Sequence, residues 1–163
     1  MPKDKSRPPP GAIPIRTSYI NAYIFKRLAD GPRFLILKRK SSYMFGLWQQ
    51  VAGKVEEGES GASAALREIE EETGKCPKYL WSADIVEMFY DIAHDCIHIV
   101  PVFVAEFSVR SRVVLSSEHS EFKWVGVDEA KEYLPFSQQK QSLDTIVREF
   151  IDKKPPRQLR IEF

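Results

Sequence analysis

The sequence predicts an α+β domain in which a mixed β-sheet is covered by helices on both sides. Strand-like segments lie before and after one central helical segment, and an amphipathic helical segment follows them near the end of the chain. Elements in this order pack as layers around a common core. The 163 residues are enough for one domain, and the hydrophobic fraction of 43% is ordinary for a globular protein.

Apolar periodicity and turn residues place the elements along the chain. Residues 1–14 are rich in proline, lysine and arginine and are expected to form a flexible arm, followed by the folded domain over 15–152 and a tail over 153–163. The turn Asp30-Gly31-Pro32 predicts that the first two strands form a hairpin. The expected strands are 16–25, 34–38, 48–52, 79–90, 97–109 and 122–125, and the expected helices are 60–73, 127–133 and 138–152.

The expected core consists of aliphatic residues from these strands and from the central helix. They are Ile20, Ile24, Leu35, Leu37, Val51, Leu66, Ile69, Val102, Val104 and Val125.

Composition and charge argue against several classes of protein. The net charge of +1 gives no global basic field, so we do not expect nucleic-acid binding. No apolar run approaches membrane-spanning length, and the N-terminal residues lack the apolar stretch of a secretory signal. Cys76 and Cys96 form no disulfide framework, so a reducing, cytoplasmic setting is expected.

The central helix carries the most informative pattern. Glu68, Glu71 and Glu72 stand at positions i, i+3 and i+4, so their carboxylates share one helix face and repel each other. A divalent cation would neutralise this face, and ligands that are all oxygen suit Mg²⁺, with Mn²⁺ as an alternative. Ser60 is the expected N-cap of the helix, and Gly74 is the expected left-handed C-cap.

Eight residues of this region fit the Nudix box, G-x5-E-x7-R-E-U-x-E-E-x-G-U, in which U is a bulky aliphatic residue. They are Gly53, Glu59, Arg67, Glu68, Ile69, Glu71, Glu72 and Gly74. The last box position departs from the pattern, because Lys75 stands where an aliphatic residue is usual. The chain therefore resembles the Nudix hydrolases, which implies an α/β/α sandwich and hydrolysis of a nucleoside diphosphate linked to another group.

The resemblance also implies roles for the residues of the box. Glu68, Glu71 and Glu72 would hold Mg²⁺ together with the carbonyl of Gly53, and Glu68 and Glu71 would serve catalysis. Glu59 and Arg67 would form an ion pair that fixes the loop against the helix.

The general base is expected outside the box, in the loop before the last strand. Glu118 is the first choice as base or metal ligand, Glu121 is the second, and a box glutamate stays an alternative. Both loop glutamates are otherwise explained as solvated side chains. His119 is placed to move protons, although a single loop histidine is more often a bystander.

Four residues before the helix are candidates for substrate contacts. Arg39 and Lys54 would bind phosphate oxygens, and Phe45 or Trp48 would stack on a base. Aromatic residues in such a position are more often part of the core.

Three segments outside the box resemble the dATP pyrophosphohydrolases, the group that includes dihydroneopterin triphosphate pyrophosphatase. They are Trp48-Gln49, Glu118-His119 with Trp124, and the helix that begins near Gln138. A nucleotide or pterin triphosphate is therefore the expected small-molecule substrate, and many relatives form homodimers. The alternatives are a diadenosine polyphosphate hydrolase and a Nudix fold that binds nucleotides without catalysis.

A second set of metal-binding residue types lies in the turn after residue 90. Asp91, His94, Asp95 and His98 match no zinc-ligand spacing, and strand alternation is taken to point Cys96 elsewhere. A polar turn is therefore the favoured interpretation of this segment.

Overall fold

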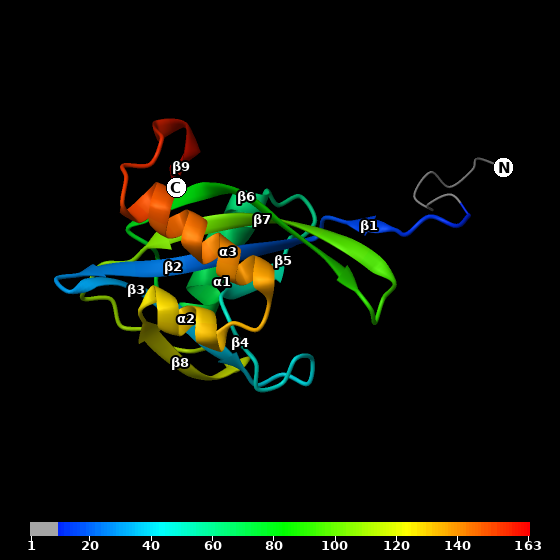
Figure 1. The fold of residues 1–163 in the computed structure, drawn as a ribbon, viewed down its shortest axis with the longest axis horizontal. Coiled ribbons are helices and arrows are strands. Elements are labelled where there is room, and N and C mark those ends of the chain that lie inside the picture. The colour runs from blue at the N-terminus through cyan, green and yellow to red at the C-terminus, as the bar shows by residue number, and fades with distance from the viewer. Residues whose placement is uncertain (1–9) are drawn as a thin grey trace.

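One mixed β-sheet organises the chain in the computed structural model, which describes residues 10–163 (Figure 1). Its order is β4-β3-β2-β7-β6-β9, with β1 on β7, β5 on β2 and β8 on β3. The strands are β1 (Ile15–Arg16), β2 (Tyr19–Leu28), β3 (Gly31–Arg39), β4 (Trp48–Gln49), β5 (Val51–Lys54), β6 (Tyr79–Asp91), β7 (Cys96–Glu106), β8 (His119–Val125) and β9 (Arg160–Ile161). Residues 1–9 of the expected arm lie outside the described part.

The pairing pattern confirms the mixed sheet. β7 runs parallel to β2 and to β1, while the other pairs are antiparallel. The predicted hairpin of the first two long strands is present, with Phe25 opposite Phe34. β6 and β7 form a second, longer hairpin.

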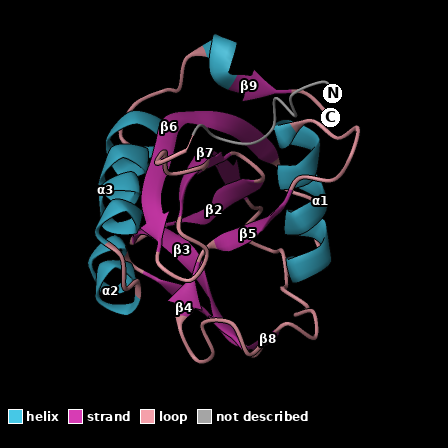
Figure 2. Cartoon of the chain, turned by 90° about the vertical axis from the view of Figure 1, so that its right-hand side faces the viewer, coloured by secondary structure: helices cyan, strands magenta, loops and turns pink. Residues whose placement is uncertain are grey.

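Helices cover both faces of the sheet, as Figure 2 shows. Helix α1 (Gly61–Thr73) lies on one side, and α2 (Val127–Tyr133) and α3 (Ser137–Ile146) lie on the other. The alternation of β2 explains the two layers: Ile20 and Ile24 belong to the cluster beneath α1, whereas Tyr23 and Phe25 belong to the cluster beneath α3. This arrangement is the predicted sandwich.

Local chemistry fixes the limits of α1. The Ser60 hydroxyl accepts a hydrogen bond of 3.1 Å from the Ser63 N–H, and Gly74 adopts φ 67° with its N–H donating to the Glu70 carbonyl. Both predicted caps are confirmed. The predicted core residues are buried, except that Leu66 is only partly buried against the cluster beneath α1.

Several element limits differ from the prediction: β2 covers Tyr19–Leu28 rather than 16–25, β3 covers Gly31–Arg39 rather than 34–38, and the strand expected at 48–52 is divided into β4 and β5. β7 ends at Glu106 rather than at 109, because the chain turns so that the carbonyls of Val109 and Ser111 accept hydrogen bonds from the buried Lys26 ammonium. β8 begins at His119, three residues early, because a register shift after Lys38 lets Arg39 pair with His119. The closing helix changes to a π-helical turn, Val147–Ile151, after α3.

Both ends of the described chain contact the sheet. The Pro14 carbonyl accepts a hydrogen bond of 2.8 Å from the Ile97 N–H. A 3₁₀ turn, Arg157–Leu159, leads into β9, which pairs with β6. The domain limits 15–152 stay a prediction. Within residues 10–163, no helix has the length and apolar character needed to cross a membrane.

Candidate active site

Arg67 ties the box loop to the box helix. Its guanidinium donates to both carboxylate oxygens of Glu59, at 2.9 and 3.0 Å, and to the Lys54 carbonyl at the end of β5, at 2.9 Å. The same group reaches Glu68 at 2.7 Å and Glu71 at 3.3 Å. Hydrogen bonding with Glu59 raises the pKa of Arg67 and lowers the pKa of Glu59. This geometry fits the positioning role expected for the pair.

Gly53 leaves the space that the Glu68 side chain occupies. A β-carbon built on Gly53 would lie 2.0 Å from Cδ of Glu68, which is far inside any permitted contact. The tight approach places the carboxylate of Glu68 against β5, beside the Gly53 backbone. The glycine of the box is therefore explained by contact with the first box glutamate.

Glu72 is the buried member of the acidic face, with 4% of its surface exposed. Its Oε2 atom is buried and has no hydrogen-bond partner among the described residues. Burial, together with the charges of Glu68 and Glu118, raises the pKa of Glu72 to about 9. Burial also raises the pKa of Glu68. Arg67 compensates part of the charge on Glu68, whereas the buried Oε2 of Glu72 has no partner in the described chain.

The two candidate bases, Glu118 and Glu121, have different surroundings. Glu118 is exposed and close enough to raise the pKa values of both Glu68 and Glu72. Glu121 instead pairs with Lys38 at 2.8 Å, and this contact lowers its pKa. The structure therefore brings Glu118, and not Glu121, to the acidic face.

His119 lies closer to the site than a loop bystander would. The side chain is buried, and its Nε2 atom stands 3.9 Å from Oε2 of Glu72 and 3.3 Å from Nε2 of Gln49. Burial, assisted by the charge of Arg39, lowers the pKa of His119. The interpretation of His119 as a bystander underestimated its contact with Glu72.

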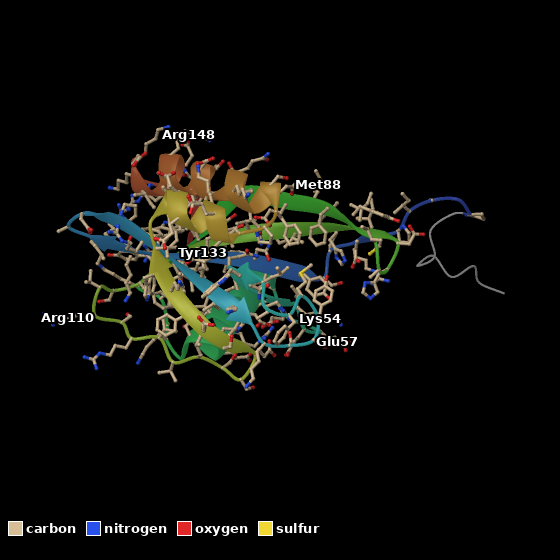
Figure 3. All side chains as sticks on the ribbon, turned by 60° about the horizontal axis from the view of Figure 1, so that its bottom comes forward. Lys54, Glu57, Met88, Arg110, Tyr133 and Arg148 are labelled. Atoms are coloured by element: carbon tan, nitrogen blue, oxygen red, sulfur yellow. The ribbon has the colours of Figure 1, made fainter. Side chains whose placement is uncertain are left out.

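The expected substrate contacts divide into two groups. Arg39 acts on the pKa values of Glu72 and His119, so its guanidinium lies near the acidic face, where it bonds the Tyr43 carbonyl at 2.9 Å. Lys54 is the exposed last residue of β5, and Glu57 lies in the exposed loop between β5 and α1 (Figure 3). Phe45 is 71% exposed.

Trp48, unlike the other substrate-contact candidates, packs against the core of the domain. Its ring packs 5.2 Å from the ring of Tyr133 and touches the core cluster beneath α3. This placement matches the core alternative as well as a stacking role.

Sequence reasoning gave no role to the two glutamines after Trp48. The Gln49 side chain contacts His119, and Oε1 of Gln50 accepts a buried hydrogen bond of 2.9 Å from Nε2 of Gln139 in α3. The resemblance at Trp48-Gln49 drew attention to this segment, but it did not reveal which residues the two glutamines contact.

The turn between β6 and β7 corrects one expectation. Cys96 does not point elsewhere: it stands two residues before His98 on the same face of β7, and its Sγ lies 3.5 Å from Nε2 of His98. One ligand atom from each of Asp91, Cys96 and His98 lies within 4.8 Å of the other two. Within residues 10–163 no other trio of such ligand atoms is that close, the box glutamates included.

The acidic face nevertheless fits a divalent cation. The unpartnered Oε2 of Glu72 is a buried oxygen that needs a positive partner, and Glu68 and Glu118 add charge of the same sign around it. All donors in this set are oxygens, which suits a hard ion.

A comparison with known families matches residues 19–150 to the NUDIX domain. The chain belongs to the Nudix family. Nudix hydrolases generally use divalent metals, and every fixed residue of the box is in place here.

Relatives of this Nudix chain carry different names. A Myxococcus xanthus protein named octanoyltransferase is 35% identical over 130 residues, which cover 76% of this chain and 34% of that protein. The chain thus spans about a third of the length of this relative.

Solved structures with the same fold include those of three named proteins. An Ap4A hydrolase from C. elegans has a TM-score of 0.71 at 24% identity, over 82% of this chain and 96% of that one. The E. coli dihydroneopterin triphosphate pyrophosphohydrolase has a TM-score of 0.70 at 23% identity, over 84% and 99%. The MutT protein of Methanosarcina mazei has a TM-score of 0.65 at 29% identity, over 83% and 94%. The first two show the Nudix fold alone.

Proposed function

We propose that this enzyme is a Mg²⁺-dependent pyrophosphohydrolase whose substrate is a (deoxy)nucleoside triphosphate or a pterin triphosphate. The observation that carries the metal is the buried, unpartnered oxygen of Glu72, surrounded by further carboxylates. A polyanionic substrate would be repelled by this face unless a cation reversed its field.

Each site residue has a role in this proposal. Glu68, Glu71, Glu72 and the carbonyl of Gly53 would hold the ion, which when bound neutralises substrate charge and acidifies a water molecule. Arg67 and Glu59 position Glu68 and Glu71 through the contacts described above. Mn²⁺ has the same ligand preferences and is the expected substitute.

Glu118 is proposed as the general base. It would accept a proton from the attacking water while the oxygen of that water bonds to phosphorus and the anhydride P–O bond breaks. The leaving phosphate takes the electron pair of the broken bond. Arg39 and Lys54 would bind phosphate oxygens, the first through its planar fork.

The triphosphate substrate class rests on three sequence segments that meet in space. Gln49 contacts His119, Gln50 bonds Gln139 of α3, and the Lys123 ammonium lies 5.5 Å from the Trp48 ring. Side chains of the segments that resemble the dATP pyrophosphohydrolase group thus contact one another, and His119 brings one of these segments to Glu72. A base or pterin would then stack on Phe45 or Trp48.

A diadenosine polyphosphate hydrolase is the alternative, and its fold does not separate it from the first proposal. Octanoyl transfer is not carried over from the Myxococcus relative, because the acidic face suits a metal ion rather than an acyl group.

Both cysteines are free thiols, which supports a reducing, cytoplasmic setting. Gel filtration with light scattering would test the proposed homodimer.

The deciding experiment measures phosphate and pyrophosphate release with and without Mg²⁺. The panel holds dNTPs, dihydroneopterin triphosphate, diadenosine tetraphosphate and ADP-ribose. We expect Mg²⁺-dependent cleavage of a triphosphate, and we expect Glu71→Gln to fold normally while losing most turnover, since an amide is a poor Mg²⁺ ligand. Preference for diadenosine tetraphosphate would replace the substrate class. Tight nucleotide binding with no turnover of any compound would instead indicate a binding module.

A further inference from the structure

A second group of metal-binding side chains lies at the tip of the β6–β7 hairpin. Figure 1 shows this hairpin projecting beyond the ends of α1 and α3. The group shares no residue with the Nudix box. It contains a carboxylate, a thiol and two imidazoles, from Asp91, His94, Cys96 and His98.

Strand pairing explains why three of these side chains meet. Asp91 is the last residue of β6 and lies directly opposite Cys96, the first residue of β7. Cys96 and His98 are two residues apart, so their side chains share one face. Asp95 adopts φ 48°, which turns the chain back within a few residues. Regular backbone pairing thus presents the three ligands before any ion binds.

The imidazole of His98 is held in place by two aromatic rings. Phe89 stacks on it with ring centroids 5.1 Å apart, and Tyr19 meets it edge-on at 5.3 Å. His98 and Cys96 are buried, and the Asp91 side chain is 10% exposed. Little rotamer freedom therefore remains to be lost when these ligands bind an ion.

The distances between ligand atoms match a tetrahedral zinc ion. Zinc lies about 2.3 Å from a thiolate and about 2.0 Å from imidazole nitrogen or carboxylate oxygen, so tetrahedral angles separate S from N by about 3.6 Å and N from O by about 3.3 Å. The observed separations are 3.5 Å for Cys96 Sγ to His98 Nε2 and 3.3 Å for His98 Nε2 to Asp91 Oδ2.

His94 supplies a fourth donor at the open side of this group. Its Nδ1 atom lies 2.8 Å from Oδ2 of Asp91, and its side chain is 54% exposed. The ligand atoms that lie within 4.8 Å of one another are those of Asp91, Cys96 and His98, so the exposed His94 imidazole would rotate toward Cys96 and His98 to bind the same ion. Nitrogen and sulfur donors distinguish this group from the oxygen-only set of the box, and they favour zinc over magnesium.

We propose that the hairpin tip is a zinc-binding site with four protein ligands, Asp91, His94, Cys96 and His98. The thiol of Cys96 releases its proton when it binds the ion, and the imidazoles bind as neutral ligands. This site does not depend on the proposed substrate class or on the Mg²⁺ site.

Two features of the surroundings set what the zinc ion would do. Burial, with the charge of Asp91, raises the pKa of Tyr43, so the carboxylate at the hairpin tip acts electrostatically on the loop that carries Tyr43 and Phe45. A bound zinc ion would therefore change the charge that acts on this loop. The Nδ1 atom of His98 is buried without a partner in the described chain, and the lack of such a partner weakens metal binding by about 10- to 100-fold. We expect moderate affinity rather than that of a structural zinc finger.

Cobalt spectroscopy of the full chain tests the proposal without any activity measurement. Co²⁺ is added to reduced protein in excess Mg²⁺, which occupies the oxygen-ligand box. We expect a near-ultraviolet thiolate-to-Co²⁺ band and the intense visible absorption of a tetrahedral site, both removed by Zn²⁺. Absence of the thiolate band at millimolar Co²⁺ would overturn the proposal.

The two cysteines provide a matched pair of variants. Cys96→Ser should abolish the thiolate band and weaken Zn²⁺ binding, measured by competition with a chelating dye, by at least about tenfold. Cys76→Ser, at the exposed cysteine, should leave both unchanged. His98→Asn provides a second test that keeps the thiol: it should also weaken Zn²⁺ binding. Zinc affinity equal to wild type in Cys96→Ser and His98→Asn would place the ion elsewhere and overturn the proposal.

Discussion

The unpartnered Oε2 of Glu72 lies 3.9 Å from Nε2 of His119, with both side chains buried. Burial acts on the two groups in opposite directions, because it raises the pKa of Glu72 to about 9 and lowers the pKa of His119. At pH 7 the metal-free protein therefore holds a neutral carboxylic acid beside a neutral imidazole. The two residues do not form an ion pair, and a cation must displace the proton of Glu72 to bind there.

Metal-free protein should lose stability as the pH rises from 7 to 8.5. Glu72 titrates near 4.5 when unfolded and near 9 when folded, so in this window the folded state binds the extra proton. The free energy of unfolding then falls by up to about 1.4 kcal/mol per pH unit. The lowered pKa of His119 adds a smaller slope of opposite sign near pH 7, because the unfolded state then binds the extra proton, and this slope fades as the pH rises further above 6.5. Urea denaturation in EDTA measures the effect.

Glu72→Gln is the control for this pH dependence, because glutamine cannot titrate. The variant should show a flatter profile between pH 7 and 8.5 than wild type. Excess Mg²⁺ should also flatten the wild-type profile, since the ion replaces the proton. Equal slopes for wild type and Glu72→Gln in EDTA would show that another group is responsible.

Gly53→Ala should remove most activity while leaving the fold intact. The new methyl group would lie 2.0 Å from Cδ of Glu68, so the glutamate must leave its position. Displacement of a catalytic group by about 1 Å costs on the order of 100-fold in rate, and we expect at least this loss in kcat/KM. Gly126→Ala is the matched control, because its β-carbon meets no atom within 4 Å. A wild-type rate in Gly53→Ala would refute the packing argument.

Sequence patterns predicted the sandwich and the acidic helix because both depend on local rules. The alternation of apolar residues in β2 and their helical spacing in α1 each predict which side of the element is buried. Ser60 and Gly74 mark where the helix begins and ends. The box spacing then identified Gly53 and Arg67, whose contacts with Glu68 confirm that these residues lie together.

Other parts of the site depend on contacts between distant segments. The register shift at Lys38 brings Arg39 opposite His119, and nothing in either segment alone records it. The Gln50–Gln139 bond joins residues that are 89 positions apart. The sequence singled out Asp91 and His98 but placed Cys96 elsewhere, because Asp91 faces Cys96 across a hairpin, a geometry that zinc spacing patterns along one chain do not describe.

Arg67→Ala should lower both activity and stability. The guanidinium joins Glu59, the Lys54 carbonyl and Glu68, so its loss frees the box loop from the helix. We expect destabilisation of about 2 kcal/mol, typical of lost charged hydrogen bonds that are partly buried. Chemical denaturation and kinetics measure the two effects. Arg148→Ala, which removes a surface arginine bonded to its neighbour Glu149, should change neither. Unaltered rate and stability in Arg67→Ala would remove its positioning role.

Glu118→Gln should reduce kcat far more than Glu121→Gln does. Glu118 lies close enough to Glu68 and Glu72 to raise both their pKa values, whereas Glu121 is held by Lys38 at 2.8 Å. Loss of a general base costs about 10²- to 10⁴-fold in rate, so we expect a fall of this size for Glu118→Gln.

The pair of variants is informative because folding should be preserved in both. The loop before β8 is fixed by its backbone, through a hydrogen bond of 2.8 Å from the Lys40 N–H to the Glu118 carbonyl, which the substitution leaves in place. Steady-state kinetics at saturating Mg²⁺ should therefore show a kcat loss at 118 with little change in KM, and a change within about threefold at 121, as for an exposed ion pair. If Glu121→Gln proved the slower enzyme, the base would lie on the Lys38 side of β8, and the placement of Glu118 beside the carboxylates would have no catalytic meaning.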